Sequence, residues 1–234
     1  MDRNEASGVA HFSLSQARLA LSCPLSWYYR YKSGMEAPAA GQAASDGSDL
    51  DELLNEWFGD GEVLGGAGAS DEVWADYQRI LDIHPIHPGQ GIPQVEILIQ
   101  VEGVDLPVLG YADLVTNMSV WEHKRGGGWD DAWWDAARRQ VALYANALGK
   151  EWGGIIQVKD RRVHIEQFEI SPELVQSVHD ELRAGWDAIK IMAQSGETIY
   201  LPAMAKPGKA CAWCDYEPVC PESVFSRYNG DSHE

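Results

Sequence analysis

Three residues near the middle of the chain have the types and spacing of a metal-dependent hydrolytic site. Asp113 lies in the stretch GYADLVT, and Glu122 and Lys124 follow in SVWEHK. Both stretches are short and rich in β-branched and aromatic residues, so we expect strands. Because side chains alternate along a strand, Glu122 and Lys124 should project from one face and His123 from the other.

These residue types suit phosphodiester hydrolysis. The carboxylates of Asp113 and Glu122, with the main-chain carbonyl of His123, make an oxygen-rich ligand set for Mg²⁺ or Mn²⁺. Such ions stabilise negative charge on phosphorus and activate water. Lys124 would orient or help deprotonate that water and offset charge in the transition state. A solvated cross-strand salt bridge contains the same residue types, so the pattern alone leaves that alternative open.

The chain carries G-x-x-D, (D/E)-x-K and Q-x-x-x-Y patterns at residues 110–113, 122–124 and 140–144. In order and spacing they resemble the motifs of the RecB-like branch of the PD-(D/E)XK nuclease superfamily. The resemblance implies that the Gln and Tyr, one helical turn apart, face the active site and the DNA backbone. It implies five catalytic residues: Asp113, Glu122, Lys124, Gln140 and Tyr144.

One expected metal ligand is missing. The family carries a His at the start of an early helix, in a G-x-x-x-H-like setting, whereas here Gly47 is followed by Asp51. A carboxylate also binds Mg²⁺, so Asp51 could replace the His. The alternative is an ordinary acidic residue in the first turn of a helix, where the helix dipole favours it. The candidate metal ligands are therefore Asp113, Glu122, His123 and Asp51.

Four cysteines form a second group with metal-binding spacing. Cys211, Cys214 and Cys220 give C-x2-C-x5-C-P, while Cys23 stands almost the whole chain away. In a reducing cytoplasm such thiols are poor candidates for disulfides. Four thiolates suit an iron-sulfur cluster or a tetrahedral zinc ion, and spacing does not choose between them. Free buried thiols are the third alternative.

The cysteine arrangement is similar to that of the iron-sulfur RecB-like nucleases of the AddB type and the CRISPR-associated Cas-four type. The opening segment, from Ser13 through the aromatic residues 27–31, also resembles theirs. The resemblance favours a phage or bacterial DNA-processing enzyme. It implies a [4Fe-4S] cluster, with zinc as the alternative, that joins the N- and C-terminal segments. Its ligands would be Cys23, Cys211, Cys214 and Cys220.

Composition bounds the partners. The formal net charge is −18 over 234 residues, which argues against a broad phosphate-binding surface because Lys and Arg carry non-specific binding to nucleic acid. Carboxylates that hold divalent ions could still bring positive charge to one place. No apolar run is long enough for a membrane span and no signal peptide is recognisable, so we expect a cytoplasmic protein.

Three functions remain in view. The first is a metal-dependent deoxyribonuclease, an exonuclease on single-stranded or end-bearing DNA in DNA processing, recombination or repair. The second is a catalytically weak or inactive module of the same fold that binds DNA or a protein partner, motivated by the missing His and the acidic charge. The third is a zinc-stabilised protein with an unrelated role, favoured only if Cys23 is not a ligand.

The elements that must position these residues can be predicted from caps and periodicity. Ser13 should cap a helical segment that Pro24 divides into two helices, and residues 35–47 are expected to form a loop. Apolar residues at helical spacing predict a helix at about 48–58, and another should lie near 71–83. Three strands of an antiparallel meander should follow within 93–124. A long helix within 126–149, a hairpin turning at 159–161 and a helix over 172–194 complete the order.

This order indicates an α/β fold with a restriction-endonuclease-like core: a mixed sheet of about five strands flanked by helices, with the N- and C-terminal segments joined at the four cysteines. We expect one nuclease domain over residues 1–234. Its helical part would span 13–90, its catalytic α/β core 91–195 and its cysteine region 196–234.

Overall fold

The structure is a computed structural model and describes residues 11–35, 42–63, 68–128, 130–194, 204–208, 211 and 214–222. The chain divides into two compact units. The sheet unit comprises the described residues of Ala40–Ile99 and Gly110–His179. The terminal unit comprises those of Met1–Ala39, Gln100–Leu109 and Asp180–Glu234.

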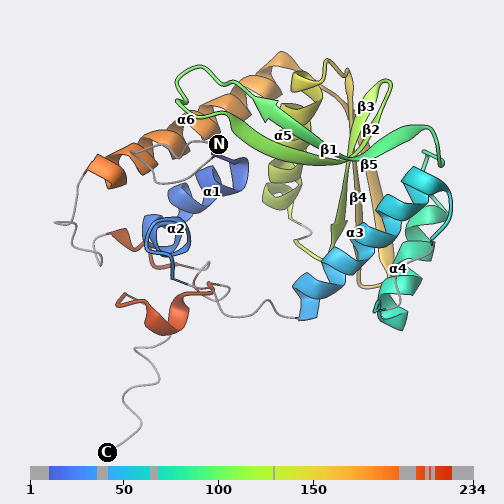
Figure 1. Cartoon of the computed structure of the whole chain (residues 1–234), viewed down its shortest axis with the longest axis horizontal. Coiled ribbons are helices and arrows are strands. Elements are labelled where there is room, and N and C mark those ends of the chain that lie inside the picture. The colour runs from blue at the N-terminus through green and yellow to red at the C-terminus, as the bar shows by residue number, and fades with distance from the viewer. Residues whose placement is uncertain are drawn as a thin grey trace, which may run out of the picture. The chain divides into compact units, whose positions relative to one another are not determined.

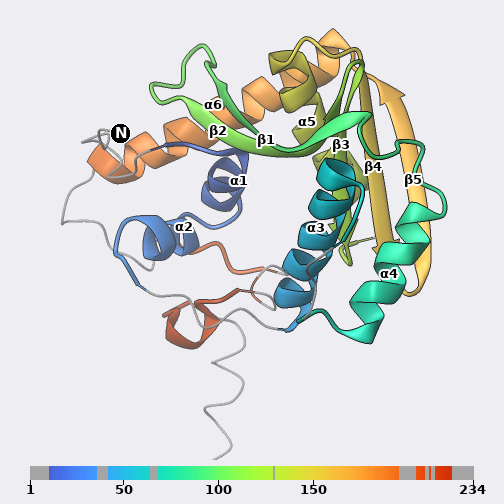
Figure 2. The same cartoon turned by 45° about the vertical axis from the view of Figure 1, so that its right-hand side comes forward.

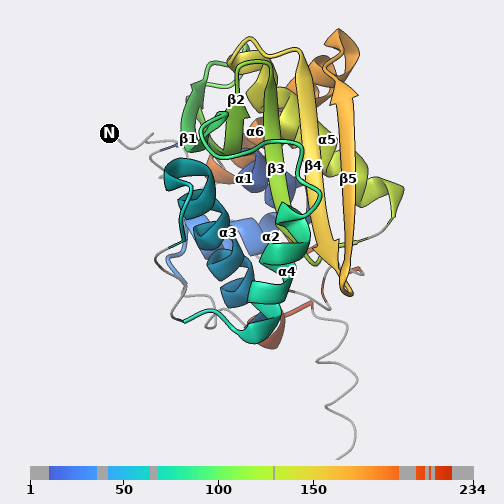
Figure 3. The ribbon, with the colours of Figure 1, turned by 90° about the vertical axis from the view of Figure 1, so that its right-hand side faces the viewer.

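The sheet unit is built on five strands in the order β1-β2-β3-β4-β5 (Figure 3). The strands are β1 (Gly91–Ile99), β2 (Val108–Thr116), β3 (Ser119–Arg125), β4 (Trp152–Lys159) and β5 (Arg162–Glu169). β2 and β3 are antiparallel, β3 and β4 are parallel, and β4 and β5 form an antiparallel hairpin. Parallel neighbours need a crossover, which helix α5 (Asp131–Ala147) supplies. The predicted mixed sheet of five strands is confirmed.

Helices cover both faces of this sheet. α3 (Gln42–Asp60) and α4 (Asp71–Leu81) lie on one face and α5 on the other (Figure 1, Figure 3). The apolar faces of α3 and α4 pack against alternate residues of the strands. The buried members of this core are Leu50, Leu53, Leu54, Phe58, Val73, Tyr77, Ile80, Leu114, Trp121, Ile156 and Val158.

The predicted loop at 35–47 is too long, because α3 already begins at Gln42. Gly47 lies inside the helix and not in a loop. A glycine in a helix interior costs only about 1 kcal/mol relative to alanine, and burial of Leu50, Leu53 and Leu54 further along α3 offsets such a cost. Residues 36–41 lie outside the described residues.

In the terminal unit, the predicted division at Pro24 is confirmed. α1 (Leu14–Ser22) begins at its cap Ser13, whose side chain accepts a hydrogen bond from the N–H of Gln16 at 3.2 Å. Pro24 is the first residue of α2 (Pro24–Tyr31), where its missing N–H costs nothing. α6 (Pro172–Gln194) begins in the sheet unit, where Ser171 accepts from the N–H of Leu174 at 3.2 Å, and continues in the terminal unit.

The C-terminal segment packs on α2, as Figure 2 shows. Leu25 and Tyr29 of α2 form one buried apolar cluster with Met204 and Tyr216. The same segment contains a short 3₁₀ helix, η4 (Glu217–Val219). Among the described helices, none combines the length and apolar character that crossing a bilayer requires.

Candidate active site and cysteine pocket

Strand β3 separates its polar side chains as the alternation predicts. Lys124 Nζ donates a hydrogen bond to Glu122 Oε1, so these two side chains share one face. His123 points to the opposite face, where its ring stacks on Phe58 at 5.7 Å and its Nε2 lies 3.1 Å from Nε2 of His84. The imidazole of His123 is therefore part of the core under α3, and only its main-chain carbonyl stays a candidate ligand.

Strand β2 brings the second carboxylate beside the first. Its register with β3 pairs Leu114 with Trp121, and continuing by one residue sets Asp113 opposite Glu122. Asp113 Oδ2 accepts a hydrogen bond from the main-chain N–H of His123 at 2.7 Å. The structure thus brings Asp113, Glu122 and Lys124 together.

Helix α5 adds the two residues of the Q-x-x-x-Y pattern. Gln140 Nε2 donates to Glu122 Oε1 at 2.7 Å. Tyr144 is buried, and its ring lies so close to Gly110 that a Cβ there would be 2.3 Å from a ring carbon. The glycine of G-x-x-D is therefore required by the tyrosine of Q-x-x-x-Y, which joins two motifs that are 34 residues apart by number.

The charges of this group act on one another. Burial and the nearby Asp113 carboxylate together raise the pKa of Glu122 to about 7, against the opposing effects of Lys124 and Gln140. Burial likewise raises the pKa of Asp113 to about 6, against the opposing effect of Lys124. Burial would lower the pKa of Lys124, but Glu122 and Asp113 together hold it above its ordinary value. The amine is therefore protonated at neutral pH and acts as a charged donor.

Asp51 lies within electrostatic reach of the same group. Burial raises its pKa to about 6, Lys124 lowers it and Glu122 raises it. It sits well inside α3 rather than in the first turn, so the helix dipole does not account for it. In the described part of the chain, however, no three His, Cys, Asp or Glu side chains lie close enough to hold a metal ion. Asp51 is thus a neighbour of the Asp113–Glu122 pair without forming one ligand group with it.

A divalent cation would supply the oxygen contact and the positive charge that these residues lack. Glu122 Oε2 is buried and has no hydrogen-bond partner among the described residues, which is costly for a carboxylate oxygen. When ionised, Asp51, Asp113 and Glu122 carry three negative charges against the single positive charge of Lys124. Hard oxygen ligands with excess negative charge are the donor set that Mg²⁺ and Mn²⁺ prefer.

An ionic network behind the site was not visible in the sequence. Arg125, the residue after Lys124, binds Asp46 of α3 at 3.0 Å and Asp76 of α4 at 3.0 Å. Both aspartates are buried. Arg125 therefore ties α3 and α4 to β3 directly beside the catalytic candidates, and the order of residues along the chain carries no signal of these pairs.

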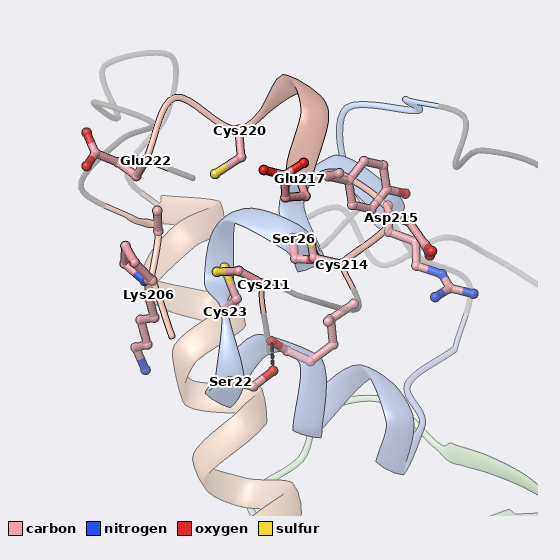
Figure 4. Close-up of a pocket in the computed structure, with 15 residues that line it drawn as sticks. Ser22, Cys23, Ser26, Lys206, Cys211, Cys214, Asp215, Glu217, Cys220 and Glu222 are labelled. Atoms are coloured by element: carbon pink, nitrogen blue, oxygen red, sulfur yellow. Dashed lines mark hydrogen bonds between the residues drawn. The ribbon is translucent and has the colours of Figure 1, made fainter. Parts of the chain in front are cut away.

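The four cysteines line one cavity of about 340 Å³ in the terminal unit (Figure 4). None forms a disulfide, and the expected four-cysteine cluster is not shown, because the thiols are spread around the cavity. Cys23 joins α1 to α2 and Cys220 follows η4. Cys214 Sγ lies 3.8 Å from Ser26 Oγ, and Cys211 Sγ accepts from the N–H of Gly208 at 3.4 Å.

Comparison with known proteins supports the fold. The family model described as the PD-(D/E)XK nuclease superfamily matches residues 11–83. A solved structure from Eubacterium rectale, described as a "putative exonuclease", is 12% identical, with 81% of this chain and 83% of that chain covered and a TM-score of 0.57. No curated protein matches the chain.

Two further solved structures have lower TM-scores. A protein named SSO0001 is 16% identical over 89% of this chain and 85% of that chain, with a TM-score of 0.47. An alkaline exonuclease from Laribacter hongkongensis is 10% identical over 78% of this chain and 87% of that chain, with a TM-score of 0.43. The family model thus makes the PD-(D/E)XK nuclease superfamily the family that residues 11–83 of this chain resemble, and the Eubacterium rectale structure shows a shared fold.

Proposed function

We propose that the chain is a divalent-metal-dependent nuclease that hydrolyses phosphodiester bonds in DNA. One observation carries the proposal: Glu122 is buried, is bonded to Lys124 and Gln140 through one oxygen, and keeps its other oxygen without a partner among the described residues. A carboxylate held in this way is prepared for a cation. A solvated cross-strand salt bridge, the alternative left open by the pattern, would not be buried.

The residues divide the work by position. Asp113 and Glu122 would hold the cation, which, when bound, supplies positive charge at the scissile phosphate and activates water. Lys124 is protonated in the metal-free chain, so it would orient the water and offset charge on the phosphate rather than act as a base there. Gln140 fixes the Glu122 carboxylate, and Tyr144 packs α5 against Gly110. Asp51 adds negative charge beside the two ligands.

We further propose an exonuclease acting on single-stranded or end-bearing DNA, of the iron-sulfur RecB-like kind. The sequence motifs support this class. The Eubacterium rectale protein that shares the fold is itself described as a "putative exonuclease".

The test is degradation of end-labelled linear DNA, single- and double-stranded, by anaerobically purified protein with Mg²⁺, Mn²⁺ or EDTA. A circular single strand of the same sequence separates exonuclease from endonuclease. Lys124→Ala should abolish cleavage. Lys150→Ala, which changes a lysine just before the first residue of β4, should not. Cleavage retained in Lys124→Ala would overturn the site. No cleavage by the wild-type protein under any condition, with DNA still bound, would favour the inactive binding module.

For the cysteines we propose a [4Fe-4S] cluster that joins the N- and C-terminal segments. Four thiols around one cavity make a soft donor set. Burial raises the pKa of Cys220, and so do the three other cysteines, which therefore lie within electrostatic reach of it. The cysteine spacing, which resembles that of iron-sulfur RecB-like nucleases, favours a cluster over zinc.

Iron and acid-labile sulfide content, with the visible absorption spectrum, test this cofactor without any measure of activity. Anaerobic protein should be brown and contain about four irons per chain if all four thiolates bind one cluster. Cys23→Ser should lose both colour and iron, while Ser26→Ala should keep them. Colourless protein containing one zinc per chain would replace the cluster with zinc, and protein without either metal would leave free thiols.

A further inference from the structure

The hairpin between β4 and β5 concentrates positive charge on an acidic protein. Lys159, Arg161 and Arg162 fall within four residues, although the whole chain has only 18 Lys and Arg against 36 Asp and Glu. Arg161 and Arg162 are exposed. Asp160, also in the turn, leaves the tip with a surplus of two positive charges.

The other arginines of the sheet unit are already neutralised. Each binds an acidic side chain: Arg79 binds Asp76, Arg125 binds Asp46 and Asp76, Arg138 binds Glu166, and Arg139 approaches Asp135. Within the described part of the chain, Arg161 and Arg162 have no such partner. These two exposed guanidinium groups, on consecutive residues of a chain of charge −18, are therefore available to an anionic partner from outside the chain.

Strand register places Lys159 and Arg162 on the face of the candidate active site, and Arg161 lies next to them in the turn. Lys124 pairs with Gln157 across β3 and β4, and Gln157 pairs with His164 across β4 and β5. Paired residues share a face, and so do residues two apart on one strand. Lys159 and its partner Arg162 therefore project from the same face as Lys124. From strand spacings, Arg162 lies about 12 Å from Lys124, measured between backbones.

The hairpin is tied to the loop that follows the catalytic lysine. Lys159 Nζ donates to the carbonyl of Gly127, and Gln157 Nε2, which is fully buried, donates to the carbonyl of Gly128 at 3.1 Å. The turn itself is a two-residue turn with positive φ at Asp160 and Arg161, 51° and 62°, the geometry of tight hairpins. The cations are thus presented on a braced support rather than on a free loop.

We propose that Arg161 and Arg162, with Lys159, bind the sugar-phosphate backbone of the substrate strand beside the scissile phosphate. The inference rests on the proposed nuclease function and names the surface that holds the DNA. A B-form strand has one phosphate per roughly 3.4 Å of axis, so a distance of about 12 Å reaches phosphates within four nucleotides of the catalytic centre. Backbone contacts of this kind position the strand and carry no sequence preference.

The experiment compares three variants with the wild-type protein. Arg161→Asn with Arg162→Gln removes both charges while keeping a residue that tolerates positive φ in the turn. Arg161→Lys with Arg162→Lys keeps the charges. Lys150→Gln removes one charge just before the first residue of β4, far along the strand from the hairpin. Dissociation constants for a labelled oligonucleotide are measured by fluorescence anisotropy in Ca²⁺ at several KCl concentrations, and kcat and KM for cleavage are measured in Mg²⁺.

We expect the neutral double variant to bind several-fold more weakly, with kcat within about twofold of wild type. The magnitude of the slope of log K for DNA binding against log[salt] should decrease for each phosphate contact that is lost. The decrease should be about 0.7 on single strands or about 0.9 on duplex. The lysine double variant should retain the slope, and Lys150→Gln should match wild type. If the neutral variant has an unchanged slope and KM while the wild-type protein cleaves DNA, the proposed role of the hairpin is wrong and the proposed nuclease function stands. Binding that weakens in the neutral variant while wild type never cleaves would support the hairpin and overturn the nuclease.

Discussion

At the scale of the residue, Glu122 meets two opposing demands. It is buried, with 1% of its surface exposed, so the folded chain favours its protonated form. The proposed chemistry needs the ionised form, because a protonated carboxyl group is a poor ligand for Mg²⁺. The same conflict holds for Asp113, whose pKa burial also raises. A bound cation resolves both conflicts by offsetting the cost of two buried negative charges.

This conflict predicts how stability depends on pH. In metal-free protein Glu122 keeps its proton up to a pKa of about 7, whereas in the unfolded chain it loses the proton near its ordinary pKa of about 4.3. Between these values the folded state binds more protons, so the free energy of unfolding falls as pH rises. Glu122→Gln should remove this contribution, and its stability relative to wild type should increase by up to about 3 kcal/mol from pH 4 to pH 8.

Urea unfolding in EDTA at pH 4, 6 and 8 measures the free energy of unfolding of both proteins. Titrations of groups that the substitution does not affect cancel in the difference between them. Mg²⁺ at pH 8 should then stabilise wild type more than Glu122→Gln, because it binds the folded state through that carboxylate. A difference between the two proteins that stays constant from pH 4 to pH 8 would mean that Glu122 is ionised throughout.

At the scale of the element, the site depends on how two helices are attached to two strands. α3 and α4 are tied to β3 by Arg125, which lies between the buried Asp46 and Asp76. Arg125→Ala would leave both aspartates buried without their cation. Removing one partner of a buried ion pair typically costs about 3–5 kcal/mol. We therefore expect a marked drop in the free energy of unfolding by urea.

The matched control is Lys190→Ala, which breaks the exposed ion pair with Asp187 on α6. Exposed pairs of this kind contribute about 0–1 kcal/mol, so this variant should unfold almost as wild type does. If Arg125→Ala were as mild as Lys190→Ala, the Arg125 network would not be what holds α3 beside the site.

α5 is attached to β2 through Gly110 and Tyr144. In Gly110→Ala the new Cβ would lie 2.3 Å from the Tyr144 ring, so we expect a loss of about 1–3 kcal/mol from overpacking. Tyr144→Leu, which removes the ring, should relieve part of this loss in the double variant. A double-mutant cycle measured by urea unfolding gives the coupling. Gly47→Ala, with open space around its Cβ, is the control and should be neutral or stabilising. A coupling of zero would contradict the contact.

Local sequence signals predicted the elements that local interactions define. Ser13 and Ser171 cap their helices, Pro24 divides α1 from α2, and the hairpin turns at Asp160 and Arg161 as expected. The catalytic candidates were also predictable, because β3 alternates and the three motifs have fixed spacing. Their roles remain predictions until variants are measured.

What the sequence could not predict depends on contacts between distant residues. Arg125 meets Asp46 and Asp76 across 79 and 49 residues. His84, in the loop that follows α4, is buried against His123, 39 residues away. Gln157 follows two isoleucines in a buried strand, and only the strand register reveals that it lies beside Lys124. Each of these needs the tertiary arrangement, which periodicity and caps do not encode.

At the scale of the whole molecule, the acidic charge and DNA binding are compatible because they act over different distances. At about 0.1 M salt the Debye length is roughly 10 Å, so acidic groups farther than this from a bound strand repel it only weakly. Cations in direct contact with phosphate are not screened in this way. A chain of charge −18 could therefore hold DNA at the proposed cation site and the β4–β5 hairpin, while the rest of its surface resists non-specific binding.

The two compact units divide the proposed chemistry. The catalytic candidates belong to the sheet unit, whereas the cavity of the four cysteines belongs to the terminal unit. A cluster bound there would connect Cys23, between α1 and α2, with the segment that contains Met204 and Tyr216. Its binding energy would then stabilise the terminal unit without taking part in hydrolysis.

Cys220→Ser should therefore lose the cluster and lower the melting temperature, while Lys124→Ala should keep its iron. The reason is that Cys220 lines the cavity of the four cysteines, whereas Lys124 donates to the Glu122 carboxylate of the sheet unit. Anaerobic calorimetry beside iron analysis measures both quantities. At a temperature where Cys220→Ser is still folded, it should cleave DNA with a kcat near that of wild type. A kcat that falls in proportion to iron content, with the protein still folded, would instead give the cluster a direct part in catalysis.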